Sequence, residues 1–118
     1  MQIKINQKKV ESYGIKFFIK GPSLDGHPSK EIARAFLYIM HNGLKKEPFG
    51  LLEDLFVDEA LRGQGIGSKL LNMVIAEAKK LGCYKLVATS RYGKDNIHAW
   101  YKRTGFENFG VEFKMYLK

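Results

Sequence analysis

Three closely spaced glycines lie between a short apolar run and a segment with helical periodicity. Gly63, Gly65 and Gly67 fall within residues 62–68, RGQGIGS. A strand that turns through glycines into a helix leaves free backbone N–H groups at the positive end of the helix dipole, where anions bind. The spacing fits neither a dinucleotide-binding loop, because Ser68 stands where the third glycine belongs, nor a P-loop, whose glycine–lysine–serine order is inverted here. The sequence therefore predicts a phosphate-binding loop of another kind.

Apolar periodicity predicts the other elements. Alternation indicates two strands in residues 1–20 joined by a link at 8–12, and another strand at 111–117, while short apolar runs indicate strands at 51–57 and 84–89. Spacings of three and four predict a helix from Ile66 to Leu81, and a second one that is capped by Asp95 or Asn96 and ends at Gly105. Residues 29–43 fit either a helix or, over 33–40, a buried strand. Glycines and prolines in residues 21–28 interrupt the regular secondary structure.

Length and composition exclude several classes of protein. The chain has 118 residues, which predicts one domain over 1–118, and a formal net charge of +8, which favours polyanionic or phosphorylated ligands. One cysteine excludes a disulfide framework, and the three histidines have no metal-binding spacing, so no metal is expected. The longest apolar run, 35–40, is too short to span a membrane, and residues 1–10 lack the apolar stretch of a signal peptide. We expect a cytoplasmic protein.

Two segments resemble the GNAT superfamily of acyl-CoA-dependent N-acyltransferases. Residues 62–67 match the signature Arg/Gln-x-x-Gly-x-Gly/Ala, and residues 52–71, LEDLFVDEALRGQGIGSKLL, are similar to the strand, loop and helix that hold the CoA pyrophosphate in that family. Residues 96–106, NIHAWYKRTGF, resemble the second family motif, in which Asn and Ala are followed by an aromatic residue, Tyr and then Gly-Phe. The resemblance is good over 51–106 and covers the N-terminal half only in outline.

The resemblance implies an α/β (α+β) fold. We expect a mixed, mostly antiparallel central sheet of about six to seven strands flanked by two main helices. The pattern assigns 33–40 to a strand and leaves only a loop's length where family members usually have two helices that wall the acceptor site. The acceptor pocket would then be open or completed by another subunit, which predicts a homodimer.

The activity implied is transfer of an acetyl group from acetyl-CoA to a primary amine, by direct attack in a ternary complex. Glu53 is the candidate base, because Leu-Glu-Asp followed by two apolar residues and Val resembles diamine acetyltransferases. Strand alternation places Asp54 on the opposite face, although either carboxylate can be the base. Tyr101 matches the tyrosine that protonates the leaving thiolate, and core packing is its alternative role.

The resemblance also implies which residues bind acetyl-CoA: Phe56, Val57, Arg62, Gly63, Gln64, Gly65, Ile66, Gly67, Ser68 and Asn96. A backbone N–H near Phe56 or Val57 would stabilise the oxyanion. The acceptor can be a polyamine, another small metabolite, or a protein N-terminus or lysine. The alternative function is a catalytically idle module that binds CoA, or a basic module that binds nucleic acid. Nucleic acid is the less expected partner, because residues 16–20 give only a faint aromatic and basic pattern.

Overall fold

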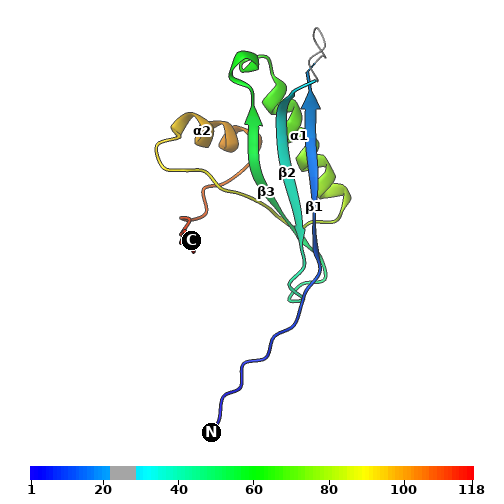
Figure 1. The fold of residues 1–118 in the computed structure, drawn as a ribbon, viewed down its shortest axis with the longest axis vertical. Helices are drawn as coiled ribbons and strands as arrows, with labels where there is room; N and C mark the ends of the chain where they lie inside the picture. The colour runs from blue at the N-terminus through cyan, green and yellow to red at the C-terminus, as the bar shows by residue number, and fades with distance from the viewer. Residues whose placement is uncertain (22–28) are drawn as a thin grey trace. The chain divides into compact units, whose positions relative to one another are not determined.

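The computed structural model describes residues 1–21 and 29–118 (Figure 1). The chain forms two compact units, residues 1–87 and 88–118, which we describe separately. The elements in chain order are β1 (Ser12–Lys20), β2 (Glu31–Met40), β3 (Phe49–Val57), the 3₁₀ helix η1 (Glu59–Leu61), α1 (Ile66–Lys80), β4 (Leu86–Ala88) and α2 (Asp95–Thr104). The interruption of regular secondary structure predicted at 21–28 lies, apart from Gly21, outside the described residues.

The sheet has the strand order β1-β2-β3-β4, and β2 pairs antiparallel with both β1 and β3. Residues 29–43, which fitted either a helix or a strand, contain the central strand β2, as the family pattern implies. Alternate residues of β2 are fully buried: Ala33, Ala35, Leu37 and Ile39. Such an uninterrupted small and apolar face is typical of a strand that is covered by a helix.

Helix α1 provides that cover. It contacts β2 and β3, and Figure 1 shows it against one face of the antiparallel strands. Its buried residues follow spacings of three and four: Leu70, Leu71, Val74 and Ala78. The helix ends at Lys80, within one residue of the predicted end, and Gly82 follows with a left-handed φ of +80°. This predicted helix is confirmed.

The expected six to seven strands are reduced to four in the described parts of the chain. Residues 1–11 and 106–118 form neither strand nor helix, so the strands predicted at the start of the chain and at 111–117 are wrong. Ile3 is 83% exposed and Phe113 is 92% exposed. Apolar alternation marks a segment that is able to form one face of a sheet, but a strand also needs a neighbour to complete its hydrogen bonds, and these segments have none here.

The second unit contains α2, which begins at Asp95 with Lys94 at the cap position and no side-chain capping bond. Neither Asp95 nor Asn96 is therefore the cap, because the backbone is already helical at both residues. Asp95 still favours the helix as an acidic residue in the first turn. The predicted end is confirmed, since Gly105 has a φ of +117° and its N–H donates to the carbonyls of residues 101 and 102. No helix in residues 1–21 and 29–118 combines the length and hydropathy of a membrane span.

The packing of α1 predicts a contrast between two nearby positions of the helix. Leu71 is 1% exposed whereas Met73 is 50% exposed. We expect Leu71→Ala to lower the free energy of unfolding by about 2–5 kcal/mol, because it leaves a cavity in the core. Met73→Ala should change it by no more than about 0.5 kcal/mol. Urea denaturation measures both values, and equal effects at the two positions would contradict the packing described here.

Candidate active site

Strand β3 contains one more residue than its neighbour at a single point. Between Arg34 and Phe36 strand β2 advances by two residues, while the paired residues of β3 advance by three, from Phe56 to Glu53. The extra residue forms a β-bulge. At the bulge Asp54 has a φ of +54°, and among the described residues it is the one non-glycine residue with positive φ. Such a conformation costs about 1–3 kcal/mol, so the surrounding structure has to maintain it.

The bulge changes the direction of the Asp54 side chain. Glu53 pairs directly with Phe36, which lies on the face of β2 opposite to the buried alanines. The Asp54 carboxylate bonds to Arg34, which lies on that same face of β2. The prediction that Glu53 and Asp54 point to opposite faces is therefore wrong, because it assumed regular alternation through a residue whose backbone is left-handed.

The two carboxylates differ in what they contact. Both oxygens of Asp54 accept hydrogen bonds from Arg34, at 3.0 Å from Nε and 3.3 Å from Nη2. Glu53 is half-buried, and no other residue in the described part of the chain forms a hydrogen bond or an ion pair with its side chain. Glu53 therefore has free oxygens that can accept a proton, whereas Asp54 is engaged in a structural contact.

The same strand also orients two backbone amides that were predicted to face an oxyanion. The N–H of Asp58 donates to the carbonyl of Ile32 at 2.8 Å. Because antiparallel pairs alternate, the N–H of Phe56 also faces β2, while that of Val57 faces the other edge of β3. Of these two residues, Val57 is the one whose amide can reach a ligand at that edge.

The glycine loop follows directly after η1. Gly63 and Gly65 have φ values of +83° and +79°, and a Cβ added at either position would have no atom within 4 Å. These glycines are needed for the turn, and they leave the backbone open. Helix α1 starts at Ile66 with no side-chain cap and no acidic residue in its first turn, and its first main-chain bond runs from Lys69 to Gly65 at 3.0 Å.

The start of α1 fits a phosphate group. The N–H groups of Ile66, Gly67 and Ser68 have no carbonyl one turn earlier, so they are available to an anion together with the helix dipole. Arg62, predicted to contact phosphate, donates from Nε to the carbonyl of Val57 at 3.1 Å. That bond attaches the loop to the end of β3. Gln64 is exposed within the loop.

In the unit formed by residues 88–118, Tyr101 is half-buried and lies between two aromatic rings. Its ring centroid is 5.6 Å from that of Trp100 and 5.2 Å from that of Phe106. Asn96 is exposed in the first turn of α2. The contacts with the two rings restrict the orientation of the Tyr101 phenol, whose hydroxyl is a potential proton donor.

Residues 25–106 match the family model described as Acetyltransferase (GNAT) family, which is more than half of the chain. The chain belongs to the GNAT acetyltransferase family. It is 34% identical over 67 residues to a probable glucosamine 6-phosphate N-acetyltransferase 2 of Oryza sativa subsp. japonica, a match that covers 57% of this chain and 39% of that protein. It is 36% identical over 66 residues to an aminoglycoside N(6')-acetyltransferase type 1 of Stenotrophomonas maltophilia, covering 56% and 43% of the two chains.

Solved structures agree with this GNAT assignment. A putative acetyltransferase from Agrobacterium tumefaciens is 28% identical with a TM-score of 0.68, and the match covers 74% of this chain and 61% of that one. Glucosamine-6-phosphate N-acetyltransferase from Arabidopsis thaliana, 24% identical, shares the fold with a TM-score of 0.68 over 75% and 59% of the two chains. The matches to the two curated relatives span about two fifths of the length of those proteins.

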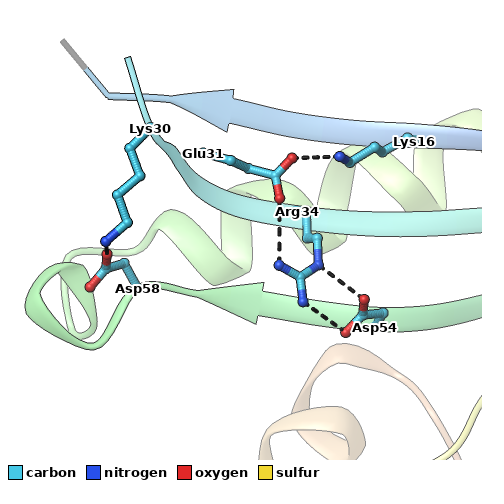
Figure 2. Close-up of polar contacts among 6 residues, drawn as sticks. All are labelled: Lys16, Lys30, Glu31, Arg34, Asp54 and Asp58. Atoms are coloured by element: carbon cyan, nitrogen blue, oxygen red, sulfur yellow. Dashed lines mark hydrogen bonds and ion pairs between the residues drawn. The ribbon is translucent and has the colours of Figure 1, made fainter. Parts of the chain in front are cut away.

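Sequence reasoning missed the charged side chains that surround the bulge of this GNAT chain. Arg34 also contacts Glu31, and Glu31 pairs with Lys16 of β1 (Figure 2). The hydrogen bond from Lys16 holds the pKa of Glu31 below its usual value, and the bond to Asp54 raises the pKa of Arg34. The available signal was the single charge at Arg34 within the apolar run of β2, since a charge in such a strand requires a partner.

His98 holds the loop that precedes α2, and Cys83 is a half-buried free thiol. His98 of α2 lies 3.0 Å from the carbonyl oxygen of Arg91 and 3.1 Å from the hydroxyl of Ser90, both through Nε2, so it attaches the preceding loop to the helix. Burial raises the pKa of the Cys83 thiol. In the described part of the chain no three His, Cys, Asp or Glu side chains are grouped so as to hold a metal ion.

Two glycines at opposite ends of α1 allow a matched test of the loop. Gly65 and Gly82 have φ values of +79° and +80°, and neither has an atom near its added Cβ. Leucine at either position should destabilise the free protein to a similar extent, because the backbone strain is the same. Only Gly65→Leu should remove the rise in Tm that acetyl-CoA produces, since only that side chain obstructs the free amides. A full ligand-induced shift in Gly65→Leu would contradict the assignment of the loop.

Proposed function

We propose that this chain transfers the acetyl group of acetyl-CoA to a primary amine by direct attack in a ternary complex. One observation carries the proposal: the strand that holds Glu53, whose side chain has no hydrogen bond or ion pair with any other described residue, leads through η1 into a loop with free backbone amides. A proton acceptor and an anion site thus lie on one continuous strand, loop and helix. Membership of the GNAT family supports this, as do the relatives named N-acetyltransferases.

The glycine loop would hold the phosphates of the donor. The amides at the start of α1 bind the pyrophosphate, with Arg62, Gln64 and Ser68 at its margins, and Asn96 contacts the pantetheine arm. When bound, acetyl-CoA supplies an activated thioester carbonyl. The loop contributes its amides without a rearrangement, because the left-handed glycines already direct the chain into the helix.

The remaining steps are proton transfers by the chain's own groups. Glu53 accepts a proton from the substrate ammonium through a water molecule, which leaves a neutral amine able to form the new C–N bond. The N–H of Val57 donates to the carbonyl oxygen as negative charge develops on it. Tyr101 gives its phenolic proton to the sulfur as the C–S bond breaks, and the second proton, which the nitrogen loses as the amide forms, returns through solvent to the tyrosinate.

The acceptor that we propose is a small-molecule amine, with amino sugars as the first class to test. The two curated relatives described above are named for glucosamine 6-phosphate and for aminoglycosides. On the face of the sheet that carries Glu53, the rings of Phe36 and Tyr38 are stacked at 6.0 Å, and Tyr38 is 37% exposed and covers Gly14. Lys16 Nζ already lies 5.8 Å from the centre of the Phe36 ring, so Tyr38 is the ring of this pair that offers a flat surface to a sugar ring carrying an ammonium group.

A screen of amines tests the proposal as a whole. Acetyl-CoA-dependent release of free thiol is measured with amino sugars, polyamines and lysine peptides at equal concentration. We expect the largest rate with an amino sugar. Binding of acetyl-CoA without turnover on any amine would instead support a catalytically idle CoA-binding module.

Tyr101→Phe isolates the proposed acid. The substitution keeps the ring stacked on Trp100 and in tilted contact with Phe106, and removes only the hydroxyl. We expect turnover to fall by about 10²- to 10⁴-fold, with the affinity for acetyl-CoA almost unchanged. Tyr92→Phe, at an exposed tyrosine of the same unit, is the control. Near-normal turnover in Tyr101→Phe would return Tyr101 to a packing role.

Glu53→Gln isolates the proposed base through the pH dependence of the rate. A carboxylate accepts a proton only when it is ionised, so the wild-type rate falls as the pH is lowered. The glutamine variant should lose part of that acidic limb as well as about 10²- to 10⁴-fold in turnover. Glu47→Gln, at an exposed glutamate that is not in the site, is the control. If rate and profile both stay intact, the amine arrives already neutral or another group is the base.

A further inference from the structure

The bulge of β3 holds the backbone of Asp54 in a conformation that is strained for aspartate but not for glycine. Its φ of +54° lies in the left-handed region, where a side chain is disfavoured. A residue in such a conformation persists when contacts around it hold it there. The contacts that Asp54 makes with neighbouring residues therefore have to maintain the bulge.

Arg34 supplies those contacts from the neighbouring strand. Its Nε and Nη2 donate separately to the two oxygens of Asp54, at 3.0 and 3.3 Å. A planar guanidinium that engages both carboxylate oxygens fixes the orientation of the carboxylate as well as its position. Figure 2 shows this pair bridging β2 and β3.

Arg34 also contacts the residue on the other side of the bulge. It pairs in register with Phe56, and its guanidinium carbon lies 4.7 Å from the centre of the Phe56 ring. The same side chain thus touches Asp54 within the bulge and Phe56 immediately after it. The amide of Val57, which is proposed to face the oxyanion, follows Phe56 directly.

Arg34 is itself held from the opposite side. Its Nη1 lies 3.4 Å from Oε2 of Glu31, and the other oxygen of Glu31 pairs with Lys16. In Figure 2 the guanidinium lies between Glu31 and Asp54. The arginine side chain is partly screened from solvent, and its two carboxylate partners restrict its rotamers, so its geometry is better defined than that of a free surface arginine.

We propose that Arg34 is a positioning residue for the acetyl transfer, which keeps the bulge of β3 in the conformation that presents Glu53 and the amide of Val57. The inference rests on the proposed function for its catalytic consequence. Its structural part, that Arg34 maintains the left-handed backbone at Asp54, stands on the contacts alone. Arg34 acts through Asp54 and Phe56 and takes no part in the proton transfers.

The test uses a variant and its rescue. Arg34→Met keeps an unbranched apolar stem but removes the hydrogen bonds, so we expect kcat to fall by about 10- to 100-fold through misplacement of the site, with KM for acetyl-CoA unchanged. Asp54→Gly in the same chain should restore most of kcat, because glycine adopts a positive φ without a clamp. Asp54→Gly alone should remain close to wild type. Thermal unfolding of each variant separates misplacement of the site from a general loss of fold, because the first lowers kcat in a protein that is still folded at the assay temperature.

Lys16→Met is the matched control, because it removes a cation from the same cluster and leaves the bonds between Arg34 and Asp54 intact. Its kcat should be close to that of the wild type. An unchanged kcat in Arg34→Met, or a loss of activity in Asp54→Gly alone, would overturn the positioning role. The second result would instead make Asp54 part of the chemistry.

A readout without substrate separates this inference from the proposed function. Amide hydrogen exchange, followed by NMR, reports the backbone bonds between β2 and β3 on either side of the bulge. We expect faster exchange at Glu53 and Phe56 in Arg34→Met and a return to the wild-type rate in the double variant with Asp54→Gly. Equal exchange in the wild type, Arg34→Met and the double variant would show that Arg34 does not maintain the backbone at Asp54, even if the wild type proves to be an active acetyltransferase. The expected exchange pattern in a protein that acetylates no amine would support the role of Arg34 in maintaining the bulge and reject the proposed function.

Discussion

The buried face of β2 leaves this strand no freedom to slide along its neighbours. Ala33, Ala35, Leu37 and Ile39 are fully enclosed, and a shift of β2 by one residue would turn all of them away from α1. The extra residue of β3 therefore has to be absorbed within β3 itself. The bulge at Asp54 follows from this constraint, and the directions of Glu53 and of the Val57 amide follow from the bulge. The core thus determines the geometry of the candidate site.

The elements that sequence predicts well are those whose periodicity is tied to burial. The α1 stripe and the alternation of residues 15–19 each describe a face that the structure covers, and both predictions hold. The segments at the two ends of the chain have equally clear alternation but remain exposed without a pairing strand. Periodicity identifies the face that a segment can bury, but the partner that buries it depends on distant parts of the chain.

The parts of the candidate site that depend on local sequence could be predicted, whereas those that depend on strand pairing could not. Spacing alone places the glycine loop at the start of α1, because a turn with free amides is a local property of the backbone. The face of the sheet on which the Asp54 side chain lies depends on how β3 pairs with β2, which local alternation does not reveal. Arg34 offered a hint as a charge inside an apolar strand, yet its partner lies 20 residues away in sequence. Contacts of that kind become visible only when the register is known.

The contact between Gly14 and Tyr38 ties together two positions on different strands. They are paired directly across β1 and β2, and a Cβ at position 14 would approach the Tyr38 ring to 2.8 Å. A larger residue at 14 would displace the tyrosine and with it the stack on Phe36. Loss of the tyrosine would leave a bare glycine in a strand, which weakens the strand. The two positions should therefore co-vary in evolution, so that a side chain gained at one is matched by a smaller one at the other.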